Sequence, residues 1–300
     1  MRKSLSNPNP SPEAVRVYEY LCEMEGKGIL SGQQECPAPG YTGSEMRYIA
    51  AVTGKLPAIR GLDYIHQDFD RVNRRAKAWW RSGGIVTICY HWGTPPDGFG
   101  YKSSLDTVDL TQLLTEGTEL HAGLLRQMDA AAVALQKLRD AGVPVLWRPF
   151  HEFDGGWFWW GKGTPEQFAR LWRLMYRRYT EEFGLNNLIW VLGYDGGVKD
   201  GWYPGDAYVD IVGADTYQPD VPVPMYHRLT ERFGDRLLRC YHENGPIPDP
   251  QELIRQKLHW SWFMTWHTTH IRRQNTRQYL RYVYNHDYVI TRDKLPRFIP

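Results

Sequence analysis

The sequence lacks several features that assign a chain to common protein classes. No apolar run reaches the roughly 18 residues that a membrane-spanning helix needs, and residues 1–12 are polar, without a signal-peptide core. The 36 basic and 34 acidic residues give a net charge of only +2, so no excess of one sign attracts nucleic acid or an acidic membrane surface. These absences favour a neutral ligand, and they leave the cellular compartment unknown.

Cysteine is scarce. The four cysteines, Cys22, Cys36, Cys89 and Cys240, show neither Cys-x-x-Cys spacing nor the density of a disulfide framework. Cys89 and Cys240 lie in apolar runs, which predicts buried thiols. A bond between Cys22 and Cys36 is conceivable, but no feature of the sequence requires it.

Motifs for phosphate, serine nucleophiles and zinc are also missing. There is no glycine-rich phosphate loop and no Gly-x-Ser-x-Gly elbow. His151-Glu152 is not followed by a second histidine four residues later, and Pro149 argues against a helix there. His267 and His270 have the spacing of one helical face, but a pair without a third ligand is weak support for a metal. We therefore expect no metal and no cofactor.

Aromatic residues are abundant, with 13 Trp, 19 Tyr and 10 Phe, and several Trp stand in tight clusters. Large aromatic side chains are ordinary core residues, and composition alone favours that interpretation. Exposed flat rings, however, also stack on the apolar faces of sugars, so a carbohydrate ligand remains open.

Short apolar runs alternate with stretches of helical period, which is typical of repeated strand-helix units around a parallel sheet. Eight strands are expected, at residues 28–34, 56–63, 84–91, 143–152, 188–194, 209–217, 237–243 and 260–267. Helices are expected at 11–25, 43–53, 69–81, 120–141, 165–183, 225–234, 250–257 and 274–286, whereas 195–208 shows no clear helix. The pattern predicts one α/β domain over 1–300, a (β/α)8 TIM barrel with residues 1–11 as an N-terminal arm.

Active sites of such barrels form at the carboxyl ends of the strands. Carboxylates, imidazoles and aromatics gather at seven of these ends: Asp63-Tyr64, His91-Trp92, His151-Glu152, Tyr194-Asp195, Asp215-Thr216-Tyr217, His242-Glu243 and Trp266-His267. One such residue alone is as easily a hydrogen-bonded strand terminus. Their recurrence indicates a functional site.

Two of these residues fit retaining glycoside hydrolysis, which needs an acid and a carboxylate nucleophile roughly 5–5.5 Å apart. Glu152 lies beside the Trp157–Trp160 cluster, where desolvation favours the protonated acid. Glu243 would be the nucleophile, kept ionised by hydrogen-bond donors. The alternative is that each glutamate caps a loop or pairs with an arginine, such as Arg148 or Arg239.

The sequence resembles glycoside hydrolase family 26, chiefly endo-β-1,4-mannanases on (β/α)8 barrels. The most specific stretch is Arg148-Pro149-Phe150-His151-Glu152 followed by Gly156-Trp157-Phe158-Trp159-Trp160-Gly161. Further matches are Val209-Asp210-Ile211-Val212-Gly213 with Asp215 and Tyr217, then Glu243-x-Gly245-Pro246-Ile247-Pro248-Asp249, and Trp262-Phe263-Met264-Thr265-Trp266-His267.

The resemblance implies Glu152 as acid/base and Glu243 as nucleophile. It also implies that the sugar at the cleavage point is surrounded by six side chains: His91, His151, Trp157, Asp215, Tyr217 and Trp266. Phe158, Trp159 and Trp160 are expected mostly as scaffold, and Gly155-Gly156 as a tight turn that aims Trp157 at the cleft. The implied partner is β-mannan or a mannooligosaccharide, bound by a secreted, monomeric enzyme.

Two departures from the family pattern are visible. The usual apolar-Thr-Glu-x-Gly signature of the nucleophile is altered to Tyr241-His242-Glu243, while a similar string at 229–234 lies in a polar helical stretch and is interpreted as a decoy. Asp154 stands where Asn is common. Another β-glycan, such as mixed-linkage glucan or β-1,3-xylan, remains an alternative substrate, and a non-catalytic carbohydrate-binding barrel remains an alternative function.

Overall fold

The computed structural model describes residues 4–218 and 223–298. Eight parallel strands form a closed barrel in sequence order, because β1 pairs with both β8 and β2. The strands are β1 (Ile29–Gln34), β2 (Ile59–Asp63), β3 (Ile85–Tyr90), β4 (Val145–Pro149), β5 (Leu188–Tyr194), β6 (Ile211–Thr216), β7 (Leu238–Asn244) and β8 (Trp262–Thr265). The expected (β/α)8 TIM barrel is confirmed.

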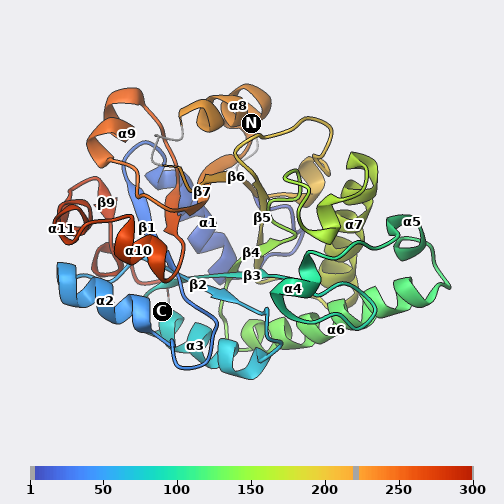
Figure 1. The fold of residues 1–300 in the computed structure, drawn as a ribbon. Helices are drawn as coiled ribbons and strands as arrows, with labels where there is room; N and C mark the ends of the chain where they lie inside the picture. The colour runs from blue at the N-terminus through green and yellow to red at the C-terminus, as the bar shows by residue number, and fades with distance from the viewer. Residues whose placement is uncertain (1–3, 219–222, 299–300) are drawn as a thin grey trace.

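Helices surround this barrel (Figure 1). They are α1 (Pro12–Met24), α2 (Ser44–Thr53), α3 (Phe69–Arg81), α4 (Gly100–Ser104), α5 (Leu110–Leu113), α6 (Glu119–Arg139), α7 (Pro165–Arg177), α8 (Val223–Phe233), α9 (Pro250–Gln256), α10 (Thr269–Arg273) and α11 (Arg277–Asn285). The connection 195–208 contains only a 3-10 turn, Asp206–Tyr208, as its composition predicts.

Local sequence signals explain where several helices begin and end. The Ser11 hydroxyl accepts a hydrogen bond from the Ala14 amide at 3.2 Å, and Pro12 follows in the first turn. Thr164 and Gln167 form a reciprocal capping box ahead of α7. Gly54 ends α2 in the left-handed conformation, with φ of 73°. These residues are the signals that placed the helix boundaries from the sequence.

The structure corrects three expectations. Strand β4 ends at Pro149 and not at residue 152, because Phe150 and Glu152 adopt positive φ. The loop after β3 contains the short helices α4 and α5, which no sequence pattern announced. A ninth strand, β9 (Val289–Ile290), pairs with Ile29 and Leu30 of β1, ahead of the residues that pair with β2.

The described part of the N-terminal arm packs on the barrel. The Ser11 amide donates to the Asn186 carbonyl at 2.7 Å, and Asn7 Nδ2 donates to the Leu185 carbonyl at 3.2 Å. Residues 1–3 of the predicted arm lie outside the described residues. All four cysteines are free thiols, and Cys89 and Cys240 are buried as expected. Within 4–218 and 223–298, no helix has the length and apolarity needed to cross a membrane.

Candidate active site

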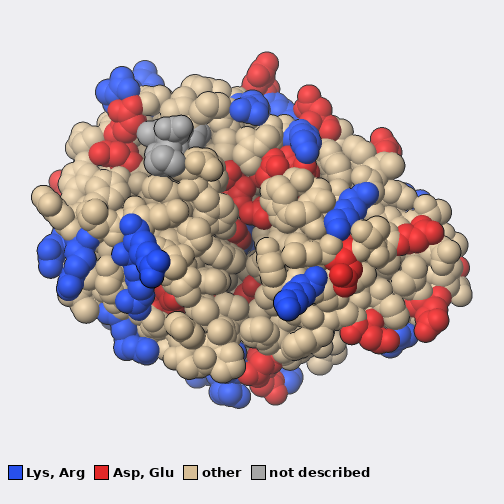
Figure 2. Space-filling model, viewed as in Figure 1, with Lys and Arg blue, Asp and Glu red and all other residues tan. Residues whose placement is uncertain are grey.

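A pocket of about 250 Å³ opens at the carboxyl ends of the strands. Acidic side chains gather in the hollow at the centre of this face (Figure 2). The lining consists of His91, Tyr101, Glu152, Trp157, Phe158, Tyr217, Glu243, Trp266 and His270. Six of the eight side chains singled out from the sequence therefore line one pocket. The other two, His151 and Asp215, are 1% and 4% exposed and lie behind its wall.

The loop after β4 presents Glu152 through an irregular backbone. Phe150 and Glu152 have φ of 50° and 53°, a conformation that costs a residue with a side chain on the order of 1–3 kcal/mol. The Glu152 amide donates to the Gly193 carbonyl of β5 at 2.7 Å, which fixes the turn. The Glu152 side chain is only 8% exposed. Glu152, which lies in the most specific motif of the sequence, therefore combines a strained backbone with a buried side chain.

Trp157 covers this carboxylate. Its indole N–H donates to Glu152 Oε2 at 3.0 Å, and its side chain is 40% exposed. Gly156 has φ of 81°, and a Cβ at Gly155 would lie 2.1 Å from the Trp157 ring. The two glycines thus allow the tight turn that brings Trp157 over the pocket, as expected from the sequence.

The other aromatic side chains of the Trp157–Trp160 cluster are buried and stabilise the loop that carries Glu152. Trp159 and Trp160 are fully buried, and Phe158 is 2% exposed at the pocket wall. The Trp159 indole donates to the Trp92 carbonyl at 3.0 Å, and the Trp160 indole donates to the His151 carbonyl at 2.9 Å. These two indoles hold the backbone of the β3 and β4 loops, so their predicted scaffold role fits the contacts.

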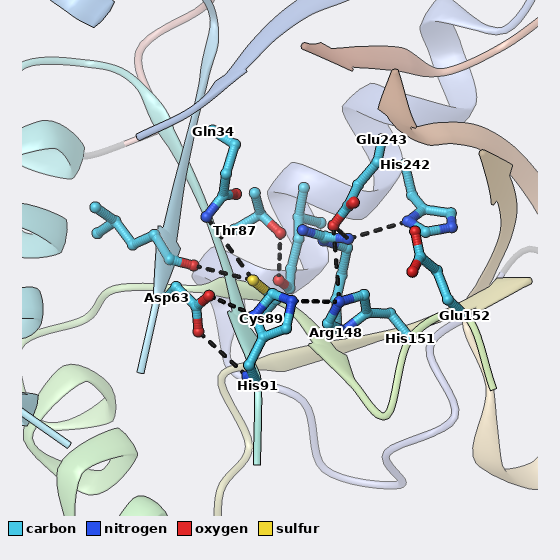
Figure 3. Close-up of polar contacts among 12 residues, drawn as sticks. Gln34, Asp63, Thr87, Cys89, His91, Arg148, His151, Glu152, His242 and Glu243 are labelled. Atoms are coloured by element: carbon cyan, nitrogen blue, oxygen red, sulfur yellow. Dashed lines mark hydrogen bonds and ion pairs between the residues drawn. The ribbon is translucent and has the colours of Figure 1, made fainter. Parts of the chain in front are cut away.

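Glu243 of β7 is held by two donors, of which Figure 3 shows Arg148. Arg148 Nη1 lies 2.9 Å from Oε1, and the Tyr217 hydroxyl donates to Oε2 at 2.7 Å. The pairing with an arginine, considered from the sequence as an alternative to catalysis, is therefore present for Glu243. Arg239 instead pairs with Glu25 at 2.7 Å. Both oxygens of Glu243 are occupied, which fixes the orientation of the carboxylate.

Burial raises the pKa of Glu243 to about 7; the charge of Arg148 opposes this shift and that of Glu152 adds to it. The charge of Arg148 and the hydrogen bond from Tyr217 both lower this pKa, the direction expected of donors beside a nucleophile, while burial opposes them. Burial, followed by the charge of Glu152, also raises the pKa of Asp215 well above its usual value. One oxygen from each of Glu152, Asp215 and Glu243 lies within 4.8 Å of the others. The protonation states of these acids are linked.

Asp63 at the end of β2, His91 after β3 and His151 after β4 form a chain of polar contacts that leads towards Glu243 (Figure 3). Asp63 Oδ2 lies 2.6 Å from His91 Nδ1, and His91 Nε2 lies 3.3 Å from His151 Nε2. Burial by itself lowers the pKa of His91, but the Asp63 carboxylate outweighs it, so the pKa lies above the usual value. Burial lowers the pKa of His151 well below the usual value. The Asp63 carboxylate thus favours the protonated form of His91, and burial favours the neutral form of His151.

His242 occupies the altered position beside Glu243. Its Nδ1 lies 3.0 Å from Arg148 Nη1, and its Nε2 lies 2.9 Å from the Tyr194 carbonyl. Burial and the charge of Arg148 lower the pKa of His242 to about 3, so the ring is neutral and accepts a hydrogen bond from the guanidinium. A Cβ at Gly193 would lie 2.8 Å from this ring. His242 therefore fits a space that a glycine leaves open.

Two further positions noted in the sequence, Glu231 and Asp154, do not line the pocket. Glu231 of the similar string at 229–234 is exposed in α8. Asp154 is buried and accepts hydrogen bonds from the amides of Asp195 and Lys199 at 2.7 and 2.9 Å, so it joins the β4 and β5 loops. Tyr101 and His270 also line the pocket; Tyr101 was not singled out, because the residues around it carry no recognisable motif, and His270 was considered only as half of a possible metal-binding pair.

Within residues 4–218 and 223–298, two groups of side chains have metal-ligating chemistry and compact spacing: Asp63 with Cys89 and His91, and the three acids Glu152, Asp215 and Glu243. In the first group, Asp63 is already hydrogen-bonded to His91. In the second, Glu243 is already paired with Arg148. The internal contacts of both groups account for their clustering.

Comparison with known proteins points to one family of glycoside hydrolases. The sequence profile of glycosyl hydrolase family 26 matches residues 6–294. A mannan endo-1,4-beta-mannosidase of Thermothelomyces thermophilus is 36% identical over 98% of this chain and 64% of its own length. Mannan endo-1,4-beta-mannosidase A of a Piromyces species is 34% identical over 99% of this chain and 51% of its own length. The chain thus spans about half to two thirds of these relatives.

Similar solved structures carry mannanase names as well. A beta-mannanase from a symbiotic protist of the termite Reticulitermes speratus, complexed with gluco-manno-oligosaccharide, superposes with a TM-score of 0.92 at 30% identity, covering 99% of this chain and 98% of that one. The GH26-CBM35 beta-(1,4)-mannanase of Podospora anserina gives 0.89 at 36% identity, covering 98% and 69%. The barrel, the pocket and these similarities together show that this chain belongs to glycosyl hydrolase family 26.

Proposed function

We propose that the chain hydrolyses internal β-1,4-mannosidic bonds of mannan with retention of configuration, as a monomeric single domain over residues 1–300. The observation that carries the proposal is the pair of buried glutamates, Glu152 and Glu243, whose nearest oxygens lie within 4.8 Å at the base of an aromatic pocket. Retaining enzymes hold their carboxyl groups about 5–5.5 Å apart, whereas inverting enzymes leave about 6.5–9.5 Å for a water. The names of the relatives support mannan as substrate.

In the first step, the Glu243 carboxylate attacks the anomeric carbon while the glycosidic bond breaks. Glu152 gives its proton to the leaving oxygen, and a glycosyl ester forms on Glu243. In the second step, Glu152 takes a proton from water, the water oxygen attacks the anomeric carbon, and Glu243 leaves as a carboxylate. At the end of the cycle both glutamates are back in their starting protonation states, one glycosidic bond has been cleaved and one water has been consumed.

The contacts suit this division of roles. Both oxygens of Glu243 accept hydrogen bonds, from Arg148 and Tyr217, whereas the direct donor to Glu152 is the indole of Trp157. The charge of Glu152 is one cause of the raised pKa of Glu243, so a proton on Glu152 lowers the pKa of Glu243. The protonated acid and the ionised nucleophile therefore favour each other.

Four of the remaining predicted side chains are proposed to bind the sugar at the cleavage point. Trp157 and Trp266 offer stacking surfaces, and His91 and Tyr217 offer hydrogen-bonding groups in the same pocket. His151 and Asp215, being behind the wall, are proposed to act by orienting His91 and Glu152.

The test compares Glu152→Ala and Glu243→Ala on mannan, mixed-linkage glucan and β-1,3-xylan. We expect strong loss in both variants and activity of the parent on mannan. With an activated aryl glycoside, azide should rescue Glu243→Ala with an inverted product and Glu152→Ala with a retained one. Undiminished turnover in both variants would refute the catalytic roles, and activity of the parent on glucan or xylan alone would refute the substrate.

A further inference from the structure

The exposed aromatic side chains are unevenly distributed over the molecule. Five aromatics in the described residues are more than a third exposed: Tyr41, Phe99, Tyr101, Trp157 and Tyr282. Four of them lie in loops that follow β1, β3 and β4, on the face that carries the pocket, and only Tyr282 lies elsewhere, in α11. Scattered exposed aromatics are normal, but a cluster on the binding face of a barrel indicates a ligand surface.

Phe99 is the most exposed large hydrophobic side chain of the described residues, at 55%, yet it does not line the pocket. It precedes Tyr101, which does line the pocket, by two residues, so their Cα atoms are at most about 7 Å apart. The Phe99 ring lies 6.2 Å from the His66 ring of the β2 loop, at 40°. Phe99 thus joins the β2 and β3 loops through His66, two residues along the chain from a residue that lines the pocket.

The backbone before Phe99 is held firmly. The Gly98 amide donates to the Thr94 carbonyl at 2.8 Å, and the Thr94 amide donates to the Ser103 hydroxyl at 3.0 Å. From α6, Gln127 Nε2 donates to the Gly98 carbonyl at 3.4 Å. A Cβ at Gly93 would lie 2.0 Å from the Gly98 carbonyl, so the loop folds tightly on itself. An exposed ring on a preorganised loop binds a ligand at a smaller cost in entropy than a mobile one.

We infer that Phe99, with His66 beside it, forms a distal sugar-binding subsite that stacks on a β-linked hexose outside the pocket that Tyr101 lines. The inference rests on the proposed function and specifies which part of a long substrate this loop holds. The chemistry fits a neutral saccharide: the Phe99 ring offers an apolar face, and the His66 ring nitrogens can exchange hydrogen bonds with hydroxyl groups.

The test uses Phe99→Ala, Phe99→Trp and, as a matched control, Tyr282→Ala, which removes an exposed aromatic from the α11 surface. For Phe99→Ala we expect kcat/KM to fall about five- to tenfold on mannohexaose and on polymer, the size of one aromatic contact, and to stay at the parent value on the shortest oligosaccharide that is cleaved. Phe99→Trp should retain the parent preference for long chains, and Tyr282→Ala should change neither value.

Titration of mannohexaose into the inactive Glu243→Ala form, with and without Phe99→Ala, gives a readout that does not depend on turnover. Weaker binding of the long ligand in the double variant supports the subsite. Three results would overturn the subsite while the parent still cleaves mannan. They are an equal loss of kcat/KM on short and long substrates in Phe99→Ala, no loss on either substrate, or the same loss in Tyr282→Ala. If the parent neither binds nor cleaves mannan, the proposed function fails, and the subsite fails with it.

Discussion

Replacing Tyr217 by Phe tests how Glu243 is kept ready for attack. The change keeps the ring and removes the hydroxyl that donates to Glu243 Oε2 at 2.7 Å. A hydrogen bond to a charged group contributes about 1.5–3 kcal/mol, so kcat/KM should fall roughly 10- to 150-fold if the bond is needed in the transition state. The fold of the barrel should be unaffected, because the ring remains.

The same variant should shift the pH profile in a defined direction. The Tyr217 hydrogen bond lowers the pKa of Glu243, which burial has raised to about 7. Its removal raises this pKa further, so the nucleophile is protonated at pH values where the parent is ionised. The acidic limb of kcat/KM should therefore move to higher pH.

An aryl β-mannobioside with a good leaving group is the suitable substrate, since it needs little help from Glu152 in the first step. Tyr279→Phe is the control, because its hydroxyl donates to the Ile247 carbonyl at 3.0 Å and Tyr279 does not line the pocket. An acidic limb that stays in place or moves to lower pH in Tyr217→Phe would refute this account of Glu243.

Three further outcomes are expected. Asp63→Asn removes the carboxylate that raises the pKa of His91, so the imidazole should lose its proton at lower pH, which NMR titration of the ring would show; an unchanged midpoint would contradict this. His242→Thr removes the acceptor for Arg148 and should lower kcat about tenfold, since a hydrogen bond to a charged group is lost, with little change in KM; a change in KM alone would contradict it. A chelator should leave mannan hydrolysis intact, whereas activity restored only by added divalent metal would contradict the proposed chemistry.

The architecture was accessible from the sequence because each strand is a continuous apolar run and most helices carry a cap or a terminal glycine. Strand β5 and helix α3 have the expected bounds to the residue. The errors have local causes. The expected end of β4 at Glu152 ignored two left-handed residues, which apolar periodicity does not reveal. Strand β9 has only two residues, too few for any pattern.

The active site could be predicted from the sequence only in part. Glu152 and Glu243 were found because carboxylates at strand ends recur and because the motifs resemble a family. Their partners were foreseen only in part: Arg148 was considered as an arginine that could pair with a glutamate, whereas Asp63 and His242 were noted only as residues of strand termini. Their pairings join β2 to β3 and β4 to β7, which adjacency in sequence does not predict. Phe99 and Tyr101 lie in a loop without periodicity.

The fit between His242 and Gly193 constrains how this active site can change over evolution or in the laboratory. A methyl group at Gly193 would collide with the imidazole at 2.8 Å, so alanine there is accessible only after position 242 has become smaller. A threonine at 242 would in turn leave a void beneath Arg148 that alanine at 193 could fill. The two substitutions should therefore be harmful singly and less so together, so the order in which they occur matters, and a double-mutant cycle would measure their coupling.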